Sequence, residues 1–205
     1  MLAEKKGVTE SNGGHILMNN NHRDEQIHII VQVALRLFHT RGYARTSLSD
    51  IAKGSGLSVK DTQTYFPGKQ EICHQVIAAH LKNQAAEFEE INHNSNPRQR
   101  LSMYLDNLAG NSDSLILQGC PMTNLYLDVR REDKILAEHA AKILRQRLEW
   151  VRQQFVLIQQ VGSVVDLPER LTSAVQGINI MAQATDDPRL IQNQVNQLKS
   201  WIRGM

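Results

Sequence analysis

Two helix-start signals lie close together near the N-terminus, and they constrain the fold of this chain more than any other feature. Ser47 and Ser58 are each followed three residues later by an aspartate, which is the spacing of a capping box. Gly54 and Gly56 separate the two signals, and Pro67 follows the second. The pattern predicts two short helices joined by a tight turn, which is a helix-turn-helix unit.

A longer helix is predicted before this unit. Its apolar residues recur at the steps of an amphipathic helix and comprise Ile27, Ile30, Val31, Ala34, Leu35 and Phe38. Gly42 stands just past the last of them, where a glycine commonly ends a helix. Residues 23–68 are therefore expected to form a three-helix, helix-turn-helix domain that binds DNA. Residues 1–22 are polar and are expected to be a disordered N-terminal extension.

The rest of the chain also carries helical patterns. Helices are expected over about 69–91, 97–109, 121–129, 133–160, 168–184 and 187–202. No segment shows the alternation of a strand, so the predicted fold class is all-α with about nine or ten helices. Leu144, Leu148, Val151, Phe155 and Ile158 alternate steps of four and three, which is the seam of a helix packed on a near-parallel partner.

Composition excludes several classes of function. The chain has 205 residues, a formal net charge of +2 and a pI of about 8.6, so a nucleic acid would need a local basic face. Cys73 and Cys120 form no CxxC pair and the histidines lack zinc-site spacing, so no metal or cofactor is expected. Because no phosphate loop or nucleophile elbow occurs, an enzyme is not expected either. The two lone thiols suit a reducing compartment. The sequence also shows no signal peptide and no apolar run of membrane-spanning length, so a cytoplasmic protein is expected.

The second short helix carries the side chains best suited to read DNA. Lys60 can meet phosphate or guanine, and Gln63 can make a two-point contact with adenine. Thr46 and Ser47 lie at a predicted helix N-terminus, where the dipole favours phosphate, and Lys69 begins the helix on the other flank. The predicted DNA-binding residues are Thr46, Ser47, Ser58, Lys60, Asp61, Gln63, Thr64, Tyr65 and Lys69.

Residues 23–81 resemble the DNA-binding region of the TetR family of transcriptional regulators, of the TetR/AcrR type. The matching segments are Ala34-Leu35-Arg36-Leu37-Phe38, Arg41-Gly42-Tyr43, Thr46-Ser47-Leu48, Asp50-Ile51-Ala52, Gly56-Leu57-Ser58 and Tyr65-Phe66-Pro67-Gly68-Lys69. The resemblance implies that residues 69–205 form a helical effector-binding and dimerisation domain. It also implies a homodimeric repressor, which a small-molecule effector releases from operator DNA. The homodimer is expected to form through the helices at 133–160 and 168–184.

Candidate effector-binding residues mix apolar bulk with a few polar groups, as ligand sites do. They are Tyr104, Cys120, Met122, Asn124, Tyr126, Trp150 and Met181. Cys120 follows a glycine at a predicted helix start, where the helix dipole stabilises a thiolate. Cys120 could therefore sense oxidants or electrophiles, or it could be a small buried residue in a tight turn.

The second short helix departs from the common pattern of the family at three positions, which are Asp61, Thr62 and Gln63. Asp61 could accept a bond from a cytosine amino group, or it could only cap the helix that Ser58 begins, and the capping interpretation is favoured. The departures leave one alternative to the repressor. In that alternative a TetR-like protein has weakened or lost DNA binding and acts through protein partners.

Overall fold

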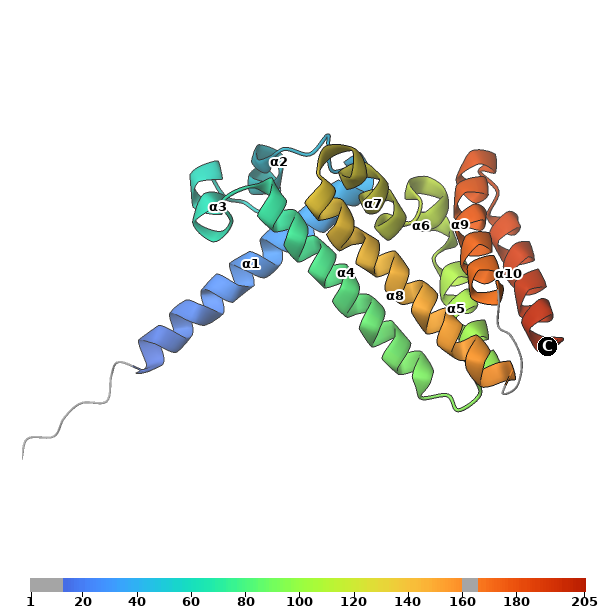
Figure 1. Cartoon of the computed structure of the whole chain (residues 1–205). Coiled ribbons are helices and arrows are strands. Elements are labelled where there is room, and N and C mark those ends of the chain that lie inside the picture. Colours follow the sequence, from blue (N-terminus) through green and yellow to red (C-terminus); the bar gives the residue numbers. More distant parts are fainter. Residues whose placement is uncertain (1–12, 160–165) are drawn as a thin grey trace, which may run out of the picture.

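The computed structural model describes residues 13–159 and 166–205, with side chains from residue 21 onward (Figure 1). In this part of the chain all regular secondary structure is helical, which confirms the predicted fold class. The helices are α1 (Gly13–Arg41), α2 (Leu48–Gly54), α3 (Val59–Tyr65), α4 (Lys69–Asn92), α5 (Pro97–Gly110), α6 (Ser112–Gln118), α7 (Pro121–Glu132), α8 (Lys134–Gln159), α9 (Leu167–Thr185) and α10 (Pro188–Arg203). Helix α1 begins inside the segment 1–22 for which the sequence predicts disorder, and residues 1–12 lie outside the described residues, as does residue 160.

Gly42 ends α1 in a conformation that only a glycine adopts without strain. Its φ is +87°, and a Cβ atom at this position would lie 2.7 Å from Oδ2 of Asp128 in α7. The same Asp128 carboxylate accepts a 2.9 Å hydrogen bond from the backbone N–H of Tyr43. The turn after α1 is thereby held against α7, so the glycine serves both the turn and this close approach.

The two predicted caps form, with different completeness. At α2 the Ser47 hydroxyl accepts from the N–H of Asp50, and the Asp50 carboxylate accepts from the N–H of Ser47, which confirms the capping box. At α3 the Ser58 hydroxyl accepts from the N–H of Asp61 at 3.0 Å and also donates to the Asp61 carboxylate at 2.6 Å. Both short helices therefore begin where the sequence predicts.

One apolar core joins the three N-terminal helices to α4, α7 and the first half of α8. Its completely buried members include Ile30, Ala34, Ile51, Ile72, Cys73, Ile77, Val129, Ala140 and Ile143. Because each buried aliphatic side chain contributes roughly 1.5–3 kcal/mol, this shared core fixes α1 to α3 firmly against α7 and α8. The division into residues 23–68 and 69–205 consequently stays a prediction, since this core crosses it.

A second core lies among the later helices. Its members come from the end of α4, from α5 to α7, from the second half of α8, and from α9 and α10. Phe88 and Trp150 stack in it with ring centroids 4.4 Å apart. Helix α6 is not predicted by the sequence, because it is short and buries only Leu115, which leaves no apolar period to detect.

The predicted seam of α8 divides between two environments. Val151 and Phe155 are completely buried in the second core, whereas Leu144 and Leu148 are half-buried beside α9. A straight α-helix drifts relative to a heptad pattern, so residues spaced by four and three do not all keep to one face. The seam therefore does not form a single surface for a partner helix.

Across the described ranges, no helix combines the length and the apolar character that a membrane span requires.

Candidate functional site

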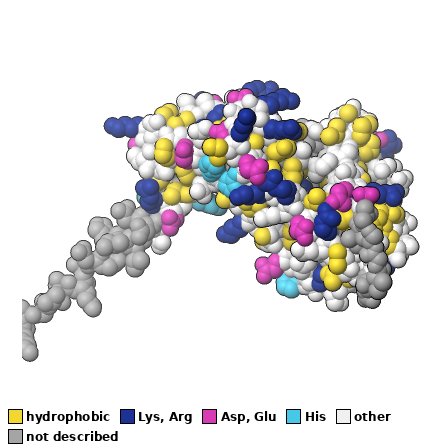
Figure 2. All heavy atoms as spheres, viewed as in Figure 1, with side chains coloured by type: hydrophobic (Ala, Val, Ile, Leu, Met, Phe, Trp, Pro, Cys, Tyr) yellow, Lys and Arg dark blue, Asp and Glu magenta, His cyan; other side chains and the backbone are white. Residues whose placement is uncertain are grey.

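Helix α3 lies next to α2, on the far side of the molecule from α9 and α10 (Figure 1). Its exposed surface is mostly polar, with Val59 as the exposed apolar residue. Lys60, Gln63 and Thr64 are exposed, while Thr62 is completely buried and anchors the opposite side of the helix. The Tyr65 ring is half-buried and lies under the guanidinium of Arg23 in α1, 5.2 Å from the ring centroid. Figure 2 shows Lys and Arg side chains protruding from this N-terminal part of the molecule.

The hydrogen bonds of Asp61 support its capping interpretation. Its N–H and its carboxylate both bond to the Ser58 hydroxyl, so the carboxylate is held at the start of α3. A carboxylate in the first turn is favoured by the helix dipole. Ser58 and Asp61 are nevertheless both exposed, so both lie on the predicted DNA-contacting surface.

Two of the predicted DNA-binding residues are engaged within the protein. The Thr46 side chain is only 1% exposed, and its hydroxyl donates to the Gly42 carbonyl at 2.8 Å, so its side chain does not reach the surface. The Lys69 ammonium donates to the Tyr43 carbonyl at 2.9 Å and lies 4.1 Å from the centre of the Tyr43 ring. Burial lowers the pKa of Lys69. Ser47 is exposed, with its hydroxyl bonded to Asp50.

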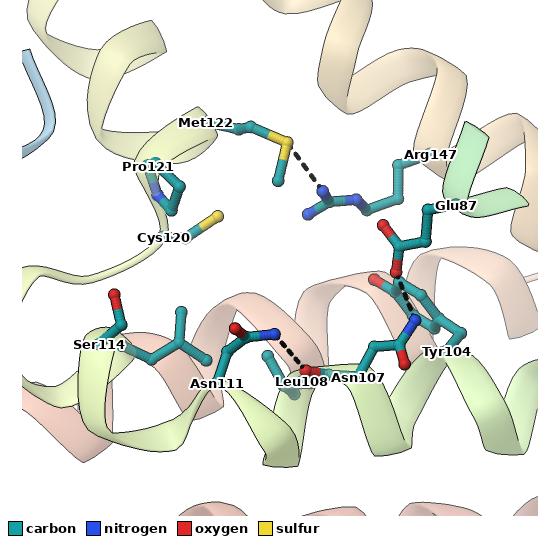
Figure 3. A pocket seen from close by; sticks show the side chains of 11 residues that line it. Glu87, Tyr104, Asn107, Leu108, Asn111, Ser114, Cys120, Pro121, Met122 and Arg147 are labelled. Carbon is teal, nitrogen blue, oxygen red and sulfur yellow. Dashed lines mark hydrogen bonds between the residues drawn. The ribbon is translucent and has the colours of Figure 1, made fainter. Parts of the chain in front are cut away.

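A cavity of about 260 Å³ lies between α4, α5, α6, α7 and α8 (Figure 3). Three of the predicted effector-binding residues, Tyr104, Cys120 and Met122, line it together. Pro121 and Leu108 add apolar surface to its walls. The cavity therefore brings together residues from helices that are far apart in the sequence.

The other predicted effector-binding residues lie elsewhere. Asn124 donates to the Gln118 carbonyl at 2.6 Å, next to the turn between α6 and α7. Tyr126 packs against the first core, and its ring lies 6.0 Å from the guanidinium of Arg130. Trp150 belongs to the second core and donates to Asn92 at 3.2 Å. Met181 is exposed on α9, beside a groove toward α10. None of these four lines the cavity.

The most polar parts of the cavity wall are residues that sequence reasoning missed. Arg147 of α8 and Glu87 of α4 line the cavity, with Asn107, Asn111 and Ser114. The Arg147 side chain is 7% exposed, and its guanidinium points into the cavity toward Met122 (Figure 3). One signal could have revealed it: Arg147 is a cation on the apolar face of α8, between Ile143 and Trp150.

One hydrogen bond connects α1 to the turn that precedes the cavity residue Cys120. Nε2 of His39 in α1 lies 3.0 Å from the carbonyl oxygen of Gly119, directly before Cys120. Gly119 has a φ of +72°, and a Cβ atom there would lie 2.7 Å from Gln183 of α9. The turn before α7 is thus packed between α1 and α9, so a displacement of either helix would move this turn.

Histidines gather where α1, α4 and α8 meet. Nδ1 of His74 lies 2.9 Å from Nδ1 of His139, so at most one of the two rings can be protonated at that nitrogen. His80 is buried, and burial together with the nearby charges of His39 and Arg147 lowers its pKa to about 4. Among the described residues no group of three or more His, Cys, Asp or Glu side chains could hold a metal ion.

Comparison with known proteins agrees with the arrangement of these helices. Residues 30–76 match the family described as "Bacterial regulatory proteins, tetR family". The chain is similar to the crystal structure of a TetR transcriptional regulator from Chloroflexus aurantiacus J-10-FL, at 17% sequence identity and a TM-score of 0.78, over 89% of this chain and 96% of that one. None of the curated proteins matches the chain.

Two further solved structures share the fold. A TetR family regulator from Agrobacterium tumefaciens is 18% identical, with a TM-score of 0.78, over 87% of this chain and 97% of that one. FadR from Bacillus subtilis, solved in complex with stearoyl-CoA, is 16% identical, with a TM-score of 0.65, over 85% of this chain and 96% of that one. These likenesses concern the fold, and the matched residues 30–76 contain both short helices with their caps.

Proposed function

Because the chain belongs to the TetR family of DNA-binding transcriptional regulators and is not an enzyme, we propose that it is a homodimeric repressor released from operator DNA by a small molecule. The single observation that carries the DNA-binding role is the surface of α3. A helix that is capped, buried on one side and mostly polar on the exposed side can enter a major groove without rearranging. Its place of action would be the cytoplasm, where operator DNA is accessible.

In this proposal, Lys60 contacts phosphate or guanine and Gln63 reads a base, with Thr64 and Tyr65 on the DNA backbone. Ser47 and Ser58, with Asp61, would flank the contact at the starts of α2 and α3. Lys69 would brace the turn after α1 from inside, and Thr46 would support it from the core, because both side chains are already bonded there.

Two copies of α3 must face successive major grooves about 34–36 Å apart, which requires a dimer. Helix α9 offers a suitable surface, since Ile180 is 62% exposed and Met181 is 51% exposed. Grooves lie on both sides of it, one toward Leu144 and Leu148 of α8 and one toward α10. The proposed dimer therefore uses α8 and α9, with α10 at the edge of the contact.

The effector would bind in the cavity and act through the turn before α7. Cys120 and Met122 line the cavity, and the adjacent Gly119 carbonyl bonds to His39 of α1. Displacing this turn would shift α1, and with it the separation of the two α3 helices. For release, the small molecule must bind the DNA-incompetent arrangement more tightly than the DNA-bound one. The stearoyl-CoA complex of FadR supports the idea that this fold can enclose a ligand.

A second candidate function is a thiol sensor, favoured by the position of Cys120 on the cavity wall. A small α,β-unsaturated carbonyl compound would bond to the Cys120 sulfur through its β-carbon, its C=C bond opening and its α-carbon taking up the thiol proton, so that no group leaves. Cys120→Ser would keep DNA binding and lose the response to the electrophile. Cys73 offers no such site, since it is completely buried and burial raises its pKa to about 12.

A mobility-shift titration of the full chain at fixed salt tests the repressor proposal. The DNA would be the region upstream of its own coding sequence, followed by selection from random DNA, with genomic DNA as competitor. We expect a dissociation constant on the order of 10⁻⁸ M or tighter for the specific site. Gln63→Ala should change the preferred sequence, whereas Gln197→Ala, an exposed change on α10, should not. Loss of binding to every DNA would favour the alternative of a regulator acting through protein partners.

A further inference from the structure

The cavity contains a buried cation without a matching anion. The Arg147 side chain is 7% exposed, yet no carboxylate forms an ion pair with it among residues 21–159 and 166–205. Its Nε donates to Gln84 at 3.2 Å, and one terminal nitrogen lies 3.0 Å from the sulfur of Met122. A thioether is a weak acceptor, so the outer edge of the guanidinium is poorly satisfied. A buried charge in this state is unfavourable until an anion meets it.

A second buried donor faces the same cavity. The Tyr104 hydroxyl is buried and has no hydrogen-bond partner among the described residues. Burial raises the pKa of Tyr104, so the hydroxyl keeps its proton and can donate it to an acceptor. Helix α7 also begins at the cavity, and its N-cap residue Cys120 provides no side-chain cap for the first N–H groups. All three features favour an acceptor that carries negative charge.

Glu87 is the one carboxylate of the cavity wall among the described residues; its charge acts on Arg147 from a distance, but the two side chains form no ion pair. It is half-buried and accepts a 2.9 Å hydrogen bond from Asn107 of α5 (Figure 3). Apart from Glu87 and Arg147, the wall carries only neutral side chains, several of them apolar. The occupant should therefore combine one anionic group with a small apolar body, since the cavity measures about 260 Å³.

We propose that the effector is a small organic carboxylate, which places its charged group against Arg147 and Tyr104 and its apolar body against Leu108, Leu115 and Pro121. The proposal rests on the proposed ligand-responsive function and adds the chemical class of the ligand. Bound in this way, the carboxylate would replace the weak contact of Arg147 with Met122, and Met122 lies at the start of α7. Ligand binding and the position of α7 would thus be linked directly.

Calorimetric titration of the full chain with matched pairs of ligands tests this class. The acids are hexanoate, benzoate and phenylacetate, and each is compared with its own neutral amide. We expect at least one acid to bind and its amide to bind at least tenfold more weakly, because charge-assisted hydrogen bonds exceed neutral ones. Equal affinity for an acid and its amide, or no binding by any acid, would overturn the proposal.

Variants of the cavity sharpen the test. Arg147→Met should weaken binding of the acid on the order of tenfold or more, and the exposed Arg145→Met on the same helix should leave it unchanged. Tyr104→Phe removes only the unpartnered hydroxyl and should weaken binding severalfold. Glu87→Gln removes a like charge and should strengthen it. An acid that binds Arg147→Met as well as the unaltered chain, or less tightly to Glu87→Gln, would contradict the assignment.

Mobility shift on the same preparations separates this proposal from the proposed function. Specific DNA binding without acid binding would overturn only the ligand class. Acid binding without specific DNA binding would support the ligand class and overturn the repressor. Acid that both binds the cavity and releases DNA, and fails to release DNA from Arg147→Met, is the result expected if both hold.

Discussion

Lys60 on α3 and Arg147 in the cavity are both cations proposed to meet an anion, but their surroundings are opposite. Lys60 is exposed, so water and salt screen its charge and it can meet any phosphate without a fitted partner. Arg147 is buried, so its charge is weakly screened and a partner must fit the cavity to reach it. The exposed surface suits a long, repetitive polyanion, whereas the cavity suits one small molecule at a time.

The α3 surface is proposed to work in pairs, one from each subunit, whereas each cavity works within one subunit. Ile180→Glu would place a charge on the proposed dimer face and should yield monomers. Specific DNA binding should fall more than a hundredfold because a monomer can occupy only one half-site, while acid binding in the cavity should persist. Light scattering coupled to gel filtration measures the first effect and mobility shift the second.

Ile135→Glu is the matched control, since Ile135 is 75% exposed in the first turn of α8. It lies nine residues before Leu144 and therefore on the opposite side of that helix from the proposed dimer face. The substitution should change neither mass nor DNA affinity. A dimer that survives Ile180→Glu would place the partner on another surface.

His80 of α4 is buried near His39 of α1 and Arg147 of α8, so it should make the packing of these three helices sensitive to acid. Its pKa is lowered to about 4 by burial and by His39 and Arg147, so the folded protein favours the neutral ring. The free energy of unfolding is therefore unaffected by His80 above a pH of about 6.5, the pKa of a histidine in the unfolded chain. It falls by on the order of 3 kcal/mol as the pH decreases toward 4.

Urea unfolding at pH 7.5 and pH 4.5 measures this effect. His80→Gln should lose less stability than the unaltered chain between the two values. His93→Gln, an exposed change near the end of α4, should behave like the unaltered chain. Equal decreases in all three proteins would mean that other groups dominate acid unfolding.

Sequence patterns predicted the N-terminal helices well because their signals are local. Ser47 and Ser58 bond to groups only three residues away, and Gly42 ends α1 through its own φ, so neighbouring residues contain the information. Thr46 marks the limit of such reasoning. Its type and position favour a phosphate contact, but its hydroxyl bonds inward to Gly42.

The cavity was only partly predictable because it is made by contacts between distant segments. Tyr104, Cys120 and Met122 were expected there from their chemistry, yet Trp150 has the same chemistry and packs in the second core. Arg147 was overlooked because its role depends on which helices cover it. A cation on an apolar helix face is the signal that would have drawn attention to this region.

Lys69 is a cation bonded within the protein and Lys60 is an exposed one, so removing each should affect stability differently. Its ammonium bonds to the Tyr43 carbonyl and lies over the Tyr43 ring, so Lys69→Met should destabilise the fold by about 1–2 kcal/mol. Lys60→Met should leave stability within about 0.5 kcal/mol, because its side chain is exposed. Denaturant unfolding of both variants decides this. Equal stability of the two would mean that the contacts of Lys69 with Tyr43 contribute nothing measurable to the fold.

Lys60 should show the reverse pattern in DNA binding. Removing one phosphate interaction reduces the slope of log affinity against log salt by about 0.9, so Lys60→Met should flatten the slope by about 1.8 in a dimer. Binding should weaken to a similar degree on all sequences, since a phosphate interaction carries no sequence information. Mobility shifts at four salt concentrations measure the slope. An unchanged slope, together with altered sequence preference, would mean that Lys60 reads guanine instead of phosphate. Lys60 would then resemble Arg147 in requiring one particular partner.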